Sequence, residues 1–206
     1  VIDSLLSLLD EYHVLATFFT THSSRALANI LYSSKHEIGI HPDFNNLLKG
    51  NPGESTFYSV CSDLKEYFPE AISVRSHSLC FGSLIQTAYE QLGITHDSSI
   101  VVPYQNNIYP LFPWKMWDGL TRVPYLFCDY ITAMTTDEPL AKLVSRSGLK
   151  VFDFHPIHVF LNTESLDRYE RTRSLHQKPT ELIRHRYEGY GTRSRLIELL
   201  EICKQS

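Results

Sequence analysis

The sequence contains few cysteines, no long apolar run and no glycine-rich phosphate loop. Its four cysteines, Cys61, Cys80, Cys128 and Cys203, lie far apart and never form a CxxC pair, so their spacing argues against a disulfide framework and against a thiolate zinc site. No apolar stretch approaches the roughly 20 residues of a membrane span, and no signal-peptide pattern opens the sequence. We therefore expect a cytoplasmic protein without membrane insertion.

Charge and composition further limit the classes of protein to which this sequence can belong. The formal net charge of −4 gives no electrostatic reason to expect a nucleic-acid partner. Apolar residues make up 43% and charged residues 20% of the 206 residues, which is ordinary for a globular protein. This length and the absence of internal repeats predict a single domain over residues 1–206.

Predicted strands alternate with predicted helices along the chain. Strands are expected at 14–21, 38–40, 71–75, 99–103, 123–128 and 149–154. Helices are expected at 1–12, 23–32, 55–68, 84–92, 139–147 and 192–203, with loops at 42–53 and 104–120. This alternation predicts parallel βα units, and six strands suffice for an incomplete α/β barrel. A doubly wound open sheet is the alternative, although no glycine-rich phosphate loop follows its first strand.

Several of these strands end on titratable residues, namely His41, Arg75 with His77, Asp129, and His155. Parallel barrels keep their chemistry at the rim formed by the carboxyl ends of their strands. We therefore expect these side chains to converge on one rim and to form a hydrolytic site.

Histidines are the candidate metal ligands. His41 follows a strand and precedes Pro42, and His22 ends the first strand. The alternatives are a hydrogen-bonded structural histidine at position 41 and a helix-cap neighbour at position 22. Imidazole suits zinc, but also iron, nickel and copper. An open site of about three protein ligands turns bound water into a hydroxide-like nucleophile.

The other residues at strand ends are also candidates for the site, and more than one role is open for Arg75 and Asp129. Arg75 suits an anionic or carbonyl group, or pairs with a neighbouring carboxylate. Asp129 leaves an apolar strand and needs a partner, so it either orients an imidazole or caps a turn. His155 again follows an apolar strand and precedes a proline, which favours a functional histidine.

Aromatic residues gather in the predicted loop over 104–120 and include Tyr104, Trp114 and Trp117. Such side chains can stack on a sugar ring, or they can form a small satellite core under the loop.

Four motifs together resemble a known family. The residues are Ala16-Thr-Phe-Phe-Thr-Thr-His22, His36-Glu-Ile-Gly-Ile-His41, Val74-Arg-Ser-His77 and Phe154-His-Pro-Ile-His158. They resemble the polysaccharide deacetylases of the NodB-homology type, and within them the WbmS-like branch associated with surface polysaccharides. The resemblance covers most of residues 1–162. It implies a distorted (β/α)7 barrel, a divalent metal and the removal of N-acyl groups from a sugar.

The resemblance also implies roles for individual residues. His41 matches the first metal histidine of the family, and Arg75 the arginine that orients a catalytic carboxylate. His155 matches the catalytic histidine, a general acid, and Asp129 falls near the acidic residue that tunes it.

Two positions depart from the family pattern. The second metal histidine, four residues after the first, is Asn45 here. The aspartate-rich first strand of the family, which supplies the base and one metal ligand, should lie upstream of residue 1. Either the chain is truncated or its site is degenerate, and His77 and His22 are our candidates to replace missing ligands.

Three functions are compatible with this sequence. The first is a hydrolase with a divalent metal, expected to be zinc, that removes the acyl group of an N-acylated sugar in surface polysaccharide metabolism. The second is a catalytically silent carbohydrate-binding barrel that has lost the metal. The third is a hydrolase of small cyclic or linear amides.

Overall fold

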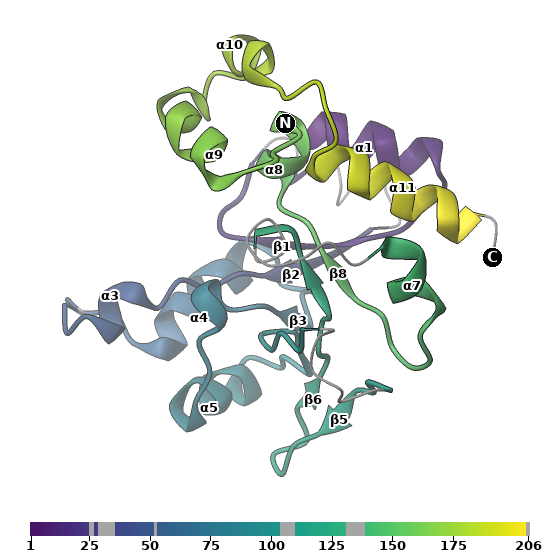
Figure 1. Cartoon of the computed structure of the whole chain (residues 1–206). Helices are drawn as coiled ribbons and strands as arrows, with labels where there is room; N and C mark the ends of the chain where they lie inside the picture. The colour runs from purple at the N-terminus through teal and green to yellow at the C-terminus, as the bar shows by residue number, and fades with distance from the viewer. Residues whose placement is uncertain (25–26, 29–35, 52, 104–109, 131–138, 205–206) are drawn as a thin grey trace. The chain divides into compact units, whose positions relative to one another are not determined.

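The computed structural model describes the chain except for residues 25–26, 29–35, 52, 104–109, 131–138 and 205–206 (Figure 1). The residues form two compact units. We call Leu15–Val101 with Phe112–Pro124 the sheet unit, and Val1–Val14 with Val102–Leu111 and Tyr125–Ser206 the helical unit. The expectation of a single domain stays a prediction.

The sheet unit contains a six-stranded sheet with the order β1-β2-β3-β4-β6-β5. Its strands are β1 (Thr17–Thr20), β2 (Glu37–Ile40), β3 (Ser73–Val74), β4 (His96–Asp97), β5 (Trp114–Lys115) and β6 (Thr121–Arg122). All neighbours are parallel except the β5–β6 pair. The predicted mixed α/β architecture with a mostly parallel sheet is therefore confirmed. The distorted (β/α)7 barrel is not confirmed, because the order of the described strands does not close this sheet into a ring.

Among the described residues, the helical segments of the sheet unit are α3 (Asn45–Leu48), α4 (Phe57–Tyr67), the 3-10 turn η1 (His77–Leu79) and α5 (Ser83–Gln91). Helix α4 begins with a capping box, in which Thr56 Oγ1 accepts a hydrogen bond from the Ser59 amide and Ser59 Oγ accepts one from the Thr56 amide. α4 and α5 pack against each other (Figure 1). The short helix α3 lies inside the stretch 42–53 that we predicted to be a loop.

Strand β2 passes its neighbours closely at Gly39. A Cβ atom at this position would lie 2.7 Å from the ring of Phe19 and 2.6 Å from Oγ of Ser73. Only glycine fits such an approach without a shift of its neighbours. Since the ring of Phe19 in turn carries the guanidinium of Arg75, 4.8 Å from its centroid, Gly39 helps to position a predicted site residue.

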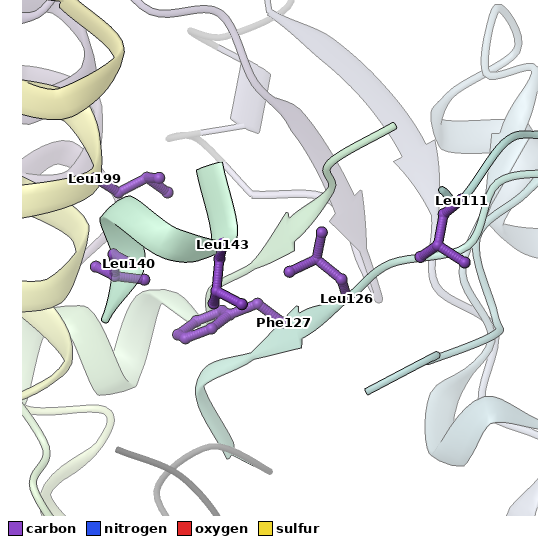
Figure 2. Packing of buried hydrophobic residues seen from close by; sticks show 6 residues of the cluster. All are labelled: Leu111, Leu126, Phe127, Leu140, Leu143 and Leu199. Atoms are coloured by element: carbon purple, nitrogen blue, oxygen red, sulfur yellow. The ribbon is translucent and has the colours of Figure 1, made fainter. Parts of the chain in front are cut away.

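The helical unit contains a two-stranded parallel sheet of β7 (Phe127–Cys128) and β8 (Phe152–Asp153). Its helices are α1 (Ile2–Glu11), α7 (Leu140–Ser145), α8 (Pro156–Leu161), α9 (Leu166–Thr172), α10 (Pro179–Leu182) and α11 (Thr192–Lys204), and its 3-10 turns are η2 (Arg173–Leu175) and η3 (Ile183–His185). Helix α8 packs against both α1 and α11. Strand β7, helix α7 and helix α11 share a core of Leu111, Leu126, Phe127, Leu140, Leu143 and Leu199 (Figure 2).

Helix α8 ends at Asn162, whose φ of 51° puts it in the left-handed region that asparagine tolerates. Its side-chain amide donates to the carbonyls of Tyr187 and Gly189 at 2.9 and 2.8 Å, and its Oδ1 accepts from the Ser194 amide at 3.1 Å. One residue thus fixes the end of α8 relative to the start of α11.

One strand prediction and one loop prediction differ from the structure. The strand expected at 99–103 is instead β4 at His96–Asp97, because the buried Asp97 interrupts the apolar pattern that marks a strand in the sequence. The loop expected at 104–120 contains β5, which turns into β6 through Asp118-Gly119. Gly119 has a φ of 86°, and Asp118 Oδ1 accepts the Leu120 amide. The predicted helix at 23–32 falls mostly outside the described residues.

Candidate active site

Asp129 and His155 lie immediately beyond the neighbouring strands β7 and β8 of the helical unit. These strands are parallel, with Cys128 paired to Asp153, so the residues that follow them emerge at the same edge. Asp129 Oδ2 accepts the backbone amide of His155 at 2.7 Å, and Asp129 Oδ1 lies 2.6 Å from Nδ1 of the ring. The Asp129 side chain is 1% exposed and that of His155 is 46% exposed.

This geometry suits a histidine that transfers protons to a molecule arriving from solvent. A carboxylate can only accept hydrogen bonds, so the pairing places the proton of the neutral imidazole on Nδ1 and directs Nε2 away from Asp129. The predicted contact between Asp129 and His155 is therefore present, and the chemical role of the pair is a proposal.

His158 packs edge-on against His155, with ring centroids 5.6 Å apart. It is buried, and its Nδ1 lies 3.2 Å from the hydroxyl of Thr163. Burial lowers the pKa of His158, Asp129 opposes that shift, and His155 and His176 add to it. The neutral form of His158 is favoured, so the exposed His155 is the better proton donor of the two.

A small cavity lies behind the aspartate of this pair and has a volume of about 30 Å³. It is lined by Phe127, Asp129, Thr163, Glu164, Gly191, Thr192 and Arg195. This space holds no more than a few water molecules.

In the sheet unit, His41 and His77 come together at the carboxyl ends of β2 and β3. The parallel ladder continues past the strands, because the Arg75 amide donates to the Ile40 carbonyl at 3.1 Å and the His77 amide to the Pro42 carbonyl at 2.9 Å. The two imidazole rings meet edge to face with centroids 5.6 Å apart. Two predicted metal ligands are therefore neighbours, as expected of residues that end adjacent parallel strands.

The third predicted ligand, His22, is exposed, and its Nδ1 lies 2.8 Å from the hydroxyl of Thr21. Within the described part of the chain, no histidine, cysteine or acidic residue completes a compact group of three with His41 and His77. The pair offers the imidazoles that a divalent metal accepts, but only two of the about three protein ligands that an open catalytic site needs.

Arg75 is buried, with 7% of its surface exposed. Its Nε donates to the Ser98 carbonyl at 3.1 Å and one terminal nitrogen donates to Ser98 Oγ at 2.9 Å. Together with the ring of Phe19 beside it, these contacts hold the guanidinium in one place, which suits a residue that orients another group.

Sequence reasoning missed the ion pair between Asp97 on β4 and Arg122 on β6, which are 0% and 2% exposed. The Ser99 hydroxyl and amide donate to Asp97 Oδ1 at 2.5 and 2.8 Å, and the Ser76 amide donates to Ser99 Oγ at 2.9 Å. This network joins β4 and β6 to the loop that follows β3, and so supports the segment that carries Arg75.

The aromatic residues around β5 are exposed. Trp117 at the tip of the β5–β6 hairpin is 81% exposed, Phe112 61% and Trp114 41%. This exposure argues against a satellite core and leaves the indole faces accessible to a ligand. Tyr104, the third residue of the predicted sugar-binding set, lies outside the described residues.

The sequence also gave no indication of a group formed by Cys128, Asp153 and His155. Their ligand atoms all lie within 4.8 Å of one another. Cys128 and Asp153 are partners across β7 and β8, and His155 follows Asp153 by two positions on the same side. Only the strand register, which the sequence does not reveal, brings the cysteine to the other two.

A mixed α/β fold with histidines beyond parallel strands, one of them fixed by a buried aspartate, defines a candidate hydrolytic enzyme. The chain belongs to the WbmS-like polysaccharide deacetylase family, whose model matches residues 1–173. It is also similar to a crystal structure described as a candidate polysaccharide deacetylase, WbmS, involved in O-antigen biosynthesis in Bordetella bronchiseptica. The identity is 36% and the TM-score 0.87, over 97% of this chain and 84% of that one.

No curated protein matches the chain. Across the residues that the structure describes, no helix has both the length and the apolar character needed to cross a membrane.

Proposed function

We propose that the chain is a metal-dependent amide hydrolase that removes the acyl group from an N-acylated sugar in surface polysaccharide metabolism. The observation that carries this proposal is the Asp129–His155 pair, in which a buried carboxylate binds both the backbone amide and the exposed imidazole of His155. Membership of a polysaccharide deacetylase family supports the reaction class.

In this proposal His155 is the general acid. The nitrogen of an amide leaves only when it is protonated as the C–N bond breaks, and a positioned imidazolium supplies that proton. Asp129 holds the ring by Nδ1, so Nε2 donates. Arg75 takes the role that the family resemblance implies for it and orients a catalytic carboxylate.

The metal belongs to the same proposal, with zinc as the expected ion and His41 and His77 as two of its ligands. A bound divalent ion would lower the pKa of its water and so supply the nucleophile. The two imidazoles fit such an ion, whereas His22, the third predicted ligand, does not lie in a compact group with them.

The substrate side of the proposal rests on the aromatic hairpin and on the relatives. Trp114 and Trp117 present exposed indole rings, and such rings stack on sugars. Tyr104 stays a predicted sugar-binding residue on the basis of the sequence. The O-antigen role of the similar Bordetella protein points to a surface polysaccharide or its precursor. The distorted (β/α)7 barrel and the cytoplasmic location remain parts of this proposal.

The alternative function is a carbohydrate-binding protein without catalysis. It is favoured by one observation, the incomplete set of ligands around His41 and His77. Such a protein would keep the aromatic surface and would bind a sugar without cleaving it.

The two functions separate in one experiment. The protein is incubated with an N-acetylated oligosaccharide and with Zn²⁺, Co²⁺ or Ni²⁺ in turn, and free amine and acetate are measured. Equal release of both products, abolished by His155→Ala, is the result expected of the hydrolase. Binding of the oligosaccharide without release of either product under any of the three metals would establish the alternative.

A further inference from the structure

The edge of the β7–β8 sheet combines three side chains of different metal-binding chemistry. Cys128 is buried, Asp153 is half-buried and His155 is exposed, and their ligand atoms lie within 4.8 Å of one another. The group therefore leads from the interior to the surface, with its open side at the histidine. None of the residues proposed above as ligands of the catalytic metal takes part in it.

We propose that Cys128, Asp153 and His155 form a second metal site that takes a thiophilic divalent cation of the zinc and cadmium class. A thiolate, a carboxylate and an imidazole are all zinc ligands, and three protein ligands with one open position are a common zinc arrangement. A tetrahedral ion holds its ligand atoms roughly 3.5 Å apart, and the three ligand atoms here lie within 4.8 Å of one another. Binding replaces the thiol proton of Cys128 with the metal and releases that proton to solvent.

The surroundings of His155 already have the form of a metal site. Metal-bound histidines commonly give their other ring nitrogen to a carboxylate, which fixes the ring and raises its basicity. Asp129 stands in this position, 2.6 Å from Nδ1, so the metal would take Nε2. The Asp129 carboxylate is held in turn by the His155 amide.

Occupation of this site has a consequence for catalysis, and this consequence rests on the proposed function. The Nε2 that binds the metal is the atom that would donate the proton to the leaving nitrogen. Excess zinc or cadmium would therefore inhibit the hydrolase at a site other than its activating metal. Inhibition would depend on Cys128, which has no part in the proposed reaction.

Cadmium titration tests the site without reference to activity, because a cadmium–thiolate bond absorbs in the near ultraviolet. We expect the band to saturate at one Cd²⁺ per chain, to disappear in Cys128→Ser and to require about 10–100-fold more cadmium in Asp129→Asn. Cys203→Ser removes an exposed cysteine and is the matched control, in which the band must remain. A band that survives Cys128→Ser, or that is lost in Cys203→Ser, overturns the proposal.

A second variant covers the case in which Cys128→Ser fails to fold, since that position is buried. His155→Ala changes an exposed side chain and leaves the thiol in place, and it should weaken cadmium binding at least 10-fold; unchanged affinity would refute the site. Where the protein hydrolyses a substrate, excess Zn²⁺ should inhibit the wild type more than Cys128→Ser. If it hydrolyses none, the proposed function fails, while the cadmium titration still decides the metal site.

Discussion

The carboxylate of Asp129 binds His155 at two points, its backbone amide at 2.7 Å and its ring Nδ1 at 2.6 Å. Two contacts from one buried group fix both the backbone position and the ring orientation of the histidine. A single contact to the ring would leave the loop after β8 free to move the imidazole. The pair therefore suits a reaction that needs a proton delivered to one defined point.

Replacement of His155 should affect turnover far more than binding. In a preparation that hydrolyses an N-acylated sugar, we expect His155→Ala to lower kcat by about 10²–10⁴-fold, because the leaving nitrogen loses its proton donor. Sugar affinity, measured by calorimetry, should stay within about twofold. His96→Ala, at an exposed histidine of the sheet unit, is the control. Retention of kcat in His155→Ala would make this histidine structural.

Removal of either imidazole of the His41–His77 pair should release the catalytic metal. We expect His41→Ala and His77→Ala each to lower zinc content, measured by elemental analysis, from about one ion per chain to well below it. The assay uses a Cys128→Ser background, so that the second site does not contribute. His22→Ala tests the third predicted ligand; this histidine does not lie in a compact group with the other two, so zinc should stay in this variant, and its loss would return His22 to the ligand set. Full occupancy in His41→Ala or His77→Ala would remove that residue from the ligand set.

The sugar-binding role of the β5–β6 hairpin can be tested at Trp117. Trp117 is 81% exposed, so we expect Trp117→Ala to leave the free energy of unfolding within about 0.5 kcal/mol of wild type and to weaken oligosaccharide binding. Sugar should also change the tryptophan fluorescence of the wild type. A loss of roughly 3–5 kcal/mol in the free energy of unfolding, as for a buried tryptophan, would instead indicate a packing role. In that case the tryptophan fluorescence of the wild type should not change when sugar is added.

Much of this site could be expected from the sequence because parallel strands place their carboxyl ends together. That rule led us to expect the strand-end residues on one rim, and within this set the pairs His41–His77 and Asp129–His155 are in contact. The metal ligands as a set were not predictable in the same way. Whether His22 joins the other two depends on the path of the chain after β1, which no local pattern encodes.

The features that the sequence did not predict depend on the register between paired strands and on polar residues within strands. Cys128 meets Asp153 only because β7 and β8 pair in one particular register. Asp97 and Arg122 interrupt the apolar pattern that identifies a strand, so the sequence placed a strand at 99–103 in place of β4 and did not predict β6. Each is tolerated because the other neutralises it in the interior.

This buried ion pair leads to a stability prediction. Arg122→Met should destabilise the protein by about 3–5 kcal/mol, because the buried Asp97, whose pKa burial already raises, loses the partner that offsets its desolvation. The double variant Asp97→Leu/Arg122→Met should recover most of that loss, since no uncompensated charge remains. Chemical denaturation of both variants measures the difference. The idea fails if the double variant is less stable than Arg122→Met alone.

The buried His158 should make stability depend on pH. Burial lowers its pKa in the folded chain below the ordinary 6.5, so the unfolded chain takes up a proton near pH 6.5 while the folded chain does not. The free energy of unfolding should then fall as the pH drops from about 7.5 to 5.5, by at most about 1.4 kcal/mol per pH unit from this residue. The loss ends once the pH passes below the folded pKa.

A variant isolates this contribution from those of the other histidines, among them His176, whose pKa burial also lowers. His158→Gln should flatten the pH dependence of the denaturation midpoint between pH 7.5 and 5.5, whatever its effect on stability at a single pH. His185→Gln replaces an exposed histidine and should leave the slope as it is in wild type. An unchanged slope in His158→Gln would mean that this side chain accepts its proton in the folded protein as readily as in the unfolded one.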